Sequence, residues 1–200
     1  MRFICGPVPA SRTFDPVAAG WTPLPESDSR RFMMVAMLST IPFIAAAIML
    51  ILPVAPELRA RMMLHPWSLP CFVLLMLALV PLHELIHAIA YGCGLRSPNL
   101  IAGFWAQRGI PYILLDEPLP RRRVLIMSAA PFCALTLLPL LAAPWFSEPW
   151  RSCILYFSFL HAALCVGDAS TFLRLLREAP AKARIHNQGW QTYWGIEAGE

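Results

Sequence analysis

The sequence predicts an all-α integral membrane protein with four transmembrane helices, and three observations support that fold class. Hydrophobic residues make up 58% of the chain and charged residues only 14%, whereas soluble domains carry about 25% charged residues. Four stretches have the roughly 20 apolar residues that a helix needs to cross the hydrocarbon core of a bilayer. Of the 12 acidic residues, only Glu84 and Asp168 lie inside these stretches.

The four predicted spans define one membrane domain. They cover Phe32–Leu52, Leu69–Tyr91, Val124–Phe146 and Ser152–Leu173. Several prolines lie in or near them, and membrane helices tolerate proline where neighbouring groups satisfy the freed backbone, so we expect kinks rather than breaks. The predicted four-helix domain therefore covers residues 32–175, with a core at 69–175.

The segments outside this domain predict two cytoplasmic tails. Residues 1–31 are rich in proline and lack the apolar core of a secretory signal, so they indicate an irregular tail, and residues 176–200 form the second tail. Thirteen of the 16 basic residues lie in or beside these tails, or in the loop between the second and third spans. The positive-inside rule then predicts that both termini are cytoplasmic. This topology explains the basic charge without a nucleic-acid partner.

The loop between the second and third spans predicts a short β-hairpin. Two apolar, β-prone runs, Leu100–Trp105 and Ile110–Leu115, are separated by four residues that include Gly109. Such a hairpin could offer an edge strand to an extended peptide substrate, or it could form a re-entrant loop that plugs the helix bundle.

The second span contains the motif His83-Glu84-Leu85-Ile86-His87. Histidines four residues apart lie one turn apart on one helix face, where both imidazoles can bind one zinc ion. Ionisable groups inside a bilayer are costly, so they mark a functional site by default. We expect His83 and His87 to be metal ligands and Glu84 to move a proton between the attacking water and the leaving amine.

Asp168 is the expected third ligand, because a catalytic zinc keeps three protein ligands and one open position. In the predicted topology the second and fourth spans run in the same direction, so His87 and Asp168 lie at a similar depth near the cytoplasmic face. His161 lies seven residues before Asp168, about 10 Å away in a straight helix. It could contact substrate, stabilise an oxyanion or replace Asp168 as the ligand. Cys165 lies one turn from both.

These residues resemble a known group of enzymes. The sequence from His83 to Ala88, followed by Gly167-Asp168 in the fourth span, is similar to the site-2 protease type of intramembrane zinc metalloprotease. The similarity is greatest to the small bacterial family of putative zincin peptidases, and it covers about residues 69–175, including Ala130-Pro131. Site-2 proteases usually have an Asn-Pro-Asp-Gly type of sequence around the aspartate, whereas this chain has Val166-Gly167-Asp168-Ala169.

The resemblance implies a zinc metallopeptidase in a bacterial inner membrane. Its expected partners are the lipid bilayer and a membrane protein or peptide substrate, whose peptide bonds it would hydrolyse near the cytoplasmic face. Three other readings remain: a membrane pseudoprotease that binds metal without cleaving, a b-type haem protein with His87 and His161 as axial ligands, and a small membrane scaffold.

Overall fold

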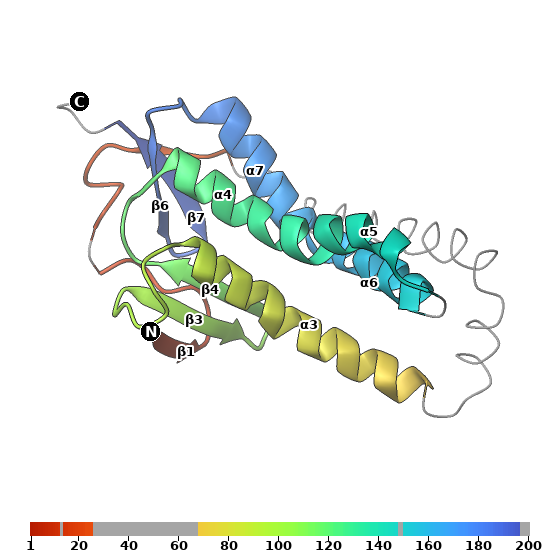
Figure 1. The fold of residues 1–200 in the computed structure, drawn as a ribbon. Coiled ribbons are helices and arrows are strands. Elements are labelled where there is room, and N and C mark those ends of the chain that lie inside the picture. The colour runs from red at the N-terminus through yellow and green to blue at the C-terminus, as the bar shows by residue number, and fades with distance from the viewer. Residues whose placement is uncertain (13, 26–67, 148–149, 197–200) are drawn as a thin grey trace. The chain divides into compact units, whose positions relative to one another are not determined.

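The computed structural model describes residues 1–12, 14–25, 68–147 and 150–196, which separate into two compact units (Figure 1). The α/β unit contains the described residues of 1–25, 84–130 and 168–196. The helical unit contains those of 68–83, 131–147 and 150–167. The first predicted span, Phe32–Leu52, lies outside the described residues.

The first sheet of the α/β unit has three strands. Strands β3 (Leu100–Trp105) and β4 (Ile110–Leu115) form an antiparallel hairpin, and β1 (Arg2–Cys5) pairs with β3 in parallel (Figure 1). Buried Ile101, Tyr112 and Leu114 form the core of this sheet. The predicted hairpin is therefore confirmed. The prediction of an irregular N-terminal tail is wrong here, because the apolar hairpin presents an edge that the first residues complete.

The second sheet contains strands from both the N-terminal and the C-terminal parts of the chain. Its order is β2 (Thr22–Pro23), β7 (Gln191–Gly195), β6 (Arg184–Gln188) and β5 (Leu119–Pro120), with every neighbouring pair antiparallel. Residues 184–195 of the expected C-terminal tail are thus a β-hairpin. Gly189, at φ 60°, supplies the left-handed backbone that this tight turn requires.

Helices α4 (Arg121–Phe132) and α7 (Val166–Glu178) contribute the apolar core beside this sheet. The buried members of that core are Leu24, Val124, Leu175, Ala179, Ala183 and Ile185. Arg121 donates from Nε to the Leu175 carbonyl at 3.0 Å and from Nη2 to the Leu176 carbonyl at 3.1 Å. These carbonyls lie in the last turn of α7, where Leu175 also accepts from the Ala179 N–H at 3.3 Å, and the arginine adds side-chain donors that cap the end of the helix.

Helix α3 (Ser68–Ala90) carries the His-Glu-x-x-His motif in its last two turns. Ala88 and Tyr91 pack with Leu100 and Leu115 of the first sheet, which anchors the end of the helix. Gly92, at φ 71°, then reverses the chain in a conformation that favours glycine. The residues that directly follow the motif are therefore held against the sheet at the point where the helix ends.

The helical unit contains the rest of the apolar chain. The π-helix η1 (Cys133–Leu137), α5 (Leu138–Ala142) and the short η2 (Ala143–Trp145) continue α4, so Arg121–Trp145 is a 25-residue helical run. Helix α6 (Trp150–Leu164) lies alongside η1 and α5 (Figure 1). In η1 the Leu138 N–H bonds to the Cys133 carbonyl, five residues earlier, instead of the usual four.

The all-α, four-span prediction is wrong. Among the described residues, only Arg121–Trp145 is a continuous helix long and apolar enough to cross a membrane, and Leu77–Ala90 of α3 is a shorter apolar segment. The predicted fourth span is two helices, α6 and α7, that break at Cys165 and pass the same test only if they are counted together. All the described strands lie outside the predicted spans, in the segments that the prediction assigned to tails and a loop. Hydropathy identifies apolar helices, and it gives no signal for short strands whose partners lie elsewhere in the chain.

His186 of β6 is a buried histidine, 3% exposed, whose two ring nitrogens have no hydrogen-bond partner among the described residues. Burial lowers the pKa of His186 from its ordinary value of 6.5, because the charged ring loses hydration there. The backbone of Glu117 and the carboxylate of Asp116 oppose this shift without overcoming it. The edge of the ring meets Phe14 at 5.4 Å between centroids.

We expect folding stability to fall as the pH falls below about 6.5, because the unfolded chain protonates His186 at a higher pH than the folded chain does. Melting temperature against pH, measured for wild type and His186→Phe, checks this. The variant removes the titrating group and keeps an aromatic ring, so its melting temperature should fall less on acidification. Parallel curves for the two proteins would contradict the prediction.

Candidate metal centre

His87 is fixed by a bond to the backbone of a neighbouring helix. Its side chain is buried, and Nδ1 lies 2.9 Å from the Met127 carbonyl oxygen of α4. A carbonyl only accepts hydrogen bonds, so Nδ1 carries the proton and the neutral ring keeps its lone pair on Nε2. That is the arrangement in which a histidine binds metal through Nε2.

Pro131 explains why the Met127 carbonyl is available. In an α-helix this carbonyl would accept from the N–H of the residue four positions later, which is Pro131, and proline has no N–H. The proline therefore leaves one acceptor in the middle of α4, and His87 uses it. Sequence reasoning did not identify Met127, although a proline four residues after it was the available signal.

Asp168 lies at the other nitrogen of His87. Its Oδ1 is 3.3 Å from His87 Nε2, and its side chain is 23% exposed. Two ligand atoms about 2.1 Å from one tetrahedral zinc ion lie about 3.4 Å apart, whereas a direct charge-assisted hydrogen bond is about 2.7–2.9 Å long. Asp168 is in the first turn of α7, where the helix dipole favours an anion. The pair thus has the spacing of two zinc ligands, and the predicted pairing of His87 with Asp168 is present.

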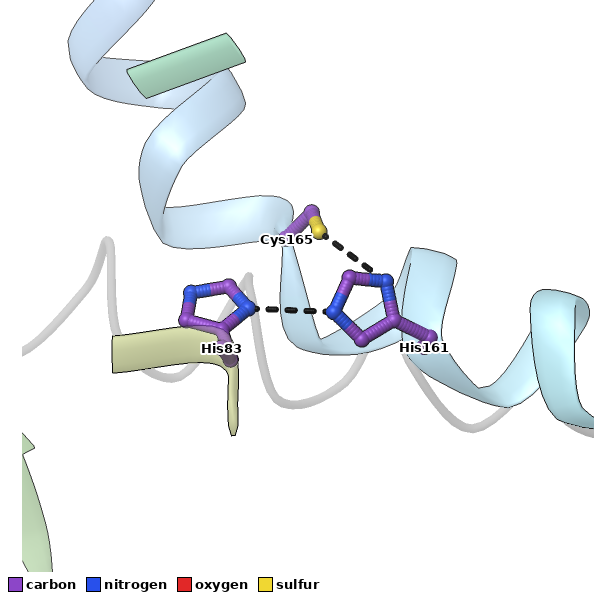
Figure 2. Close-up of side chains that lie close together, drawn as sticks. All are labelled: His83, His161 and Cys165. Atoms are coloured by element: carbon purple, nitrogen blue, oxygen red, sulfur yellow. Dashed lines mark hydrogen bonds between the residues drawn. The ribbon is translucent and has the colours of Figure 1, made fainter. Parts of the chain in front are cut away.

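His83 lies in a second group of polar side chains, within the helical unit (Figure 2). Its Nδ1 is 3.1 Å from Nε2 of His161, and His161 Nδ1 is 3.6 Å from Sγ of Cys165. All three side chains are buried, and each offers a ligand atom within 4.8 Å of the others. The group is therefore also a candidate for metal binding, with a soft thiol in place of a carboxylate.

Thr136 completes this group, and sequence reasoning missed it. Its Oγ1 is 2.9 Å from Nδ1 of His161, and it is 2% exposed. A threonine in an apolar helix carries no signal of its own. Its position depends on the π-helical register of η1, which sequence does not reveal.

Two expectations about His161 change with the structure. The 10 Å separation from Asp168 assumed one straight helix, and the break at Cys165 removes that assumption. In the haem reading, His161 would need a ring nitrogen for iron. Both of its nitrogens are in hydrogen bonds, one with His83 and one with Thr136, so the reading loses its second axial ligand.

Glu84 follows His83 directly and precedes His87 by three residues in α3. Its side chain is half-buried, and it lies among polar contacts rather than in open solvent. A carboxylate with this partial access to water is suited to exchange a proton with it.

Comparison with known proteins identifies the family. Residues 76–184 match the model of a family described as putative zincin peptidases, and this match covers more than half of the chain. The chain belongs to that family, as its resemblance predicted, and zincins are zinc proteins. No curated protein and no solved structure matches the chain.

We expect His87→Ala and Asp168→Ala each to weaken zinc binding on the order of 100-fold or more, because each removes one ligand atom of the pair. Zinc titration of the metal-free protein, read by competition with a chromophoric chelator, measures this. Glu178→Ala is the matched control, since Glu178 is an exposed carboxylate at the other end of α7. Unchanged affinity in both ligand variants would show that the pair does not bind zinc.

Proposed function

We propose that this protein is a zinc-dependent peptidase that hydrolyses peptide bonds of membrane-associated substrates near the cytoplasmic face of a bacterial inner membrane. The observation that carries the proposal is the pair of contacts made by the two ring nitrogens of His87. Its Nδ1 is committed to Met127, and its Nε2 lies 3.3 Å from the Asp168 carboxylate. An imidazole nitrogen and a carboxylate oxygen at this spacing match two ligand atoms of one tetrahedral zinc ion.

His83 is the proposed third ligand. It lies four residues before His87 in one unbroken helix, and side chains four residues apart share a helix face. Two histidines and one carboxylate form a common ligand set for catalytic zinc, with one position open for water or substrate.

Glu84 is the proposed proton carrier. A bound zinc ion would polarise the scissile carbonyl and lower the pKa of its water to about 7. Glu84 takes a proton from the water molecule while the water oxygen attacks the carbonyl carbon of the peptide bond. It then gives that proton to the amine nitrogen as the C–N bond breaks, so protons balance over the cycle.

The edge of the first sheet is the proposed binding place for the substrate backbone. Strand β4 is an outer strand in the order β1-β3-β4, so an extended peptide could pair with its outer side, where it would compete with the Tyr91 hydroxyl for the Ile113 carbonyl. An extended peptide would be held there by hydrogen bonds to its backbone, so binding would depend little on its side chains.

The helical run Arg121–Trp145 supports a membrane location. It would be about 37 Å long, and its large apolar side chains point outward, with Leu138 64% and Leu141 59% exposed. The run begins with three arginines, which are expected at the cytoplasmic interface. It ends at Trp145, and tryptophan is expected at the opposite interface. The partners implied are the bilayer and a membrane protein or peptide.

We expect the full-length protein to stay with bacterial membranes after an alkaline carbonate wash. A double variant with Leu138→Arg and Leu141→Arg should be released in larger part, because an arginine in the hydrocarbon core is costly, up to about 2.5–3.5 kcal/mol at the helix centre and less toward its ends. Leu95→Arg is the control, an exposed leucine in the loop after α3. Release of the wild-type protein by the wash would exclude the membrane location.

We expect Glu84→Gln to bind zinc and to lose at least about 100-fold in cleavage rate, since general acid–base catalysis contributes roughly 10²–10⁴-fold. The assay is cleavage of peptides embedded in lipid vesicles, with zinc content measured on the same samples. Glu178→Gln, an exposed carboxylate on α7, is the control. Cleavage by Glu84→Gln at the wild-type rate would assign the proton transfer elsewhere. A zinc-loaded wild type that cleaves none of a broad peptide set would favour the pseudoprotease.

A further inference from the structure

His161 is fully buried, 0% exposed, and both of its ring nitrogens are in hydrogen bonds (Figure 2). We propose that His161 is a positioning residue, which holds the proton of His83 on Nδ1 so that Nε2 of His83 is the zinc ligand. This inference rests on the proposed zinc site and names a residue that acts on the metal only through a ligand.

The hydrogen-bond chain allows two proton arrangements. In one, His83 Nδ1–H donates to His161 Nε2, and His161 Nδ1–H donates to Thr136 Oγ1. In the other, the Thr136 hydroxyl donates to His161 Nδ1, and His161 Nε2–H donates to His83 Nδ1. The second arrangement puts the proton of neutral His83 on Nε2 and leaves that nitrogen no lone pair for a metal. Only the first allows His83 to bind zinc through Nε2.

The same nitrogen is used by the other histidine of the motif. His87 donates from Nδ1 to the Met127 carbonyl, so its Nε2 faces Asp168. His83 has its own acceptor at Nδ1, a histidine in place of a carbonyl, at 3.1 Å. Hydrogen bonds at the outer nitrogen of a ligand histidine fix its tautomer and ring orientation.

Thr136 fixes which way His161 points. Its Oγ1 lies 2.9 Å from Nδ1, in a buried place where a hydrogen bond is stronger than in water. Thr136 is in the π-helix η1, whose wider turn is often found at functional sites. The chain from Thr136 through His161 to His83 thus lies entirely inside the helical unit.

A metal ion bound by His83, His161 and Cys165 is the competing use of these residues. Figure 2 shows the thiol facing Nδ1 of His161, at 3.6 Å, while Nε2 of that ring faces His83. Each of the three residues offers one ligand atom within 4.8 Å of the other two, so their spacing alone would admit a metal ion. The 3.1 Å between His83 Nδ1 and His161 Nε2 is a hydrogen-bond distance, shorter than the about 3.4 Å between two ligand atoms of a tetrahedral zinc ion, so the geometry favours a hydrogen-bond chain over a second metal.

The test compares zinc affinity and stoichiometry in His161→Leu and His161→Gln. Leucine removes the acceptor for His83, whereas glutamine keeps an acceptor at about the same reach. We expect His161→Leu to bind one zinc ion per chain with roughly 10–100-fold lower affinity, and His161→Gln to recover most of the loss. Thr136→Val should weaken binding in the same direction, and Thr136→Ser should not. Ser158→Ala is the matched control, because Ser158 is buried on the same helix but bonds only to the Ile154 carbonyl of its own helix among the bonds described.

A second measurement keeps the inference separate from the proposed function. Nitrogen-15 NMR of histidine-labelled, metal-free protein reports the tautomer of His83 directly. We expect Nδ1–H in wild type and in His161→Gln, and a shift toward Nε2–H in His161→Leu. Wild type that binds no zinc would overturn the proposed function, and the NMR result would then decide the role of His161 alone. Unchanged affinity and an unchanged tautomer in His161→Leu would overturn the inference. Loss of one of two bound zinc ions in that variant would overturn it in favour of a second metal site.

Discussion

The hydrogen bond from His87 to the carbonyl of Met127 is the constraint on which the rest of the site depends. Pro131 creates it by withholding the N–H that would otherwise occupy that carbonyl. The side chain of Met127 packs against two of the apolar clusters of the α/β unit, the one of Ala88, Tyr91, Leu100 and Leu115 and the one around Leu175 of α7. One residue therefore fixes the orientation of a candidate ligand and links the cores that hold it. A single hydrogen bond contributes only about 0.5–1.5 kcal/mol to stability, but here it also decides which nitrogen of His87 is left for a metal.

The polar side chains near the motif are held in place by specific polar partners rather than by contact with solvent. His87 has a carbonyl on one side and a carboxylate on the other, and His161 has a histidine and a hydroxyl. Burying polar groups costs free energy unless hydrogen bonds compensate for the lost water. An apolar chain that keeps such groups buried has to fix each proton in place.

Local patterns predicted some elements well. The apolar stretch Leu69–Tyr91 predicted a helix, and α3 covers Ser68–Ala90. Two β-prone runs around Gly109 predicted the hairpin, and an apolar stretch predicted the helical run to Trp145. The remaining strands, β1, β2, β5, β6 and β7, were missed because they are short and polar or mixed. The strands β1, β2 and β5 pair only with partners far away in the chain, as Arg2 does with Ile101, whereas β6 and β7 form a local hairpin. The break at Cys165 was missed because the flanking residues continue a helical, apolar pattern.

The sequence by itself determined the candidate zinc ligands, the one-turn spacing of two of them in α3, and the family to which the chain belongs. These are set by residue identity and by the 3.6-residue period of the helix, so no tertiary information is needed. The tertiary structure alone decided that the tails form strands, that Asp168 Oδ1 meets His87 Nε2, and that His161 bonds to His83 and Thr136. Those contacts join residues 25 to 81 positions apart. A contact of that range depends on how helices end, bend and pack, which no local pattern specifies.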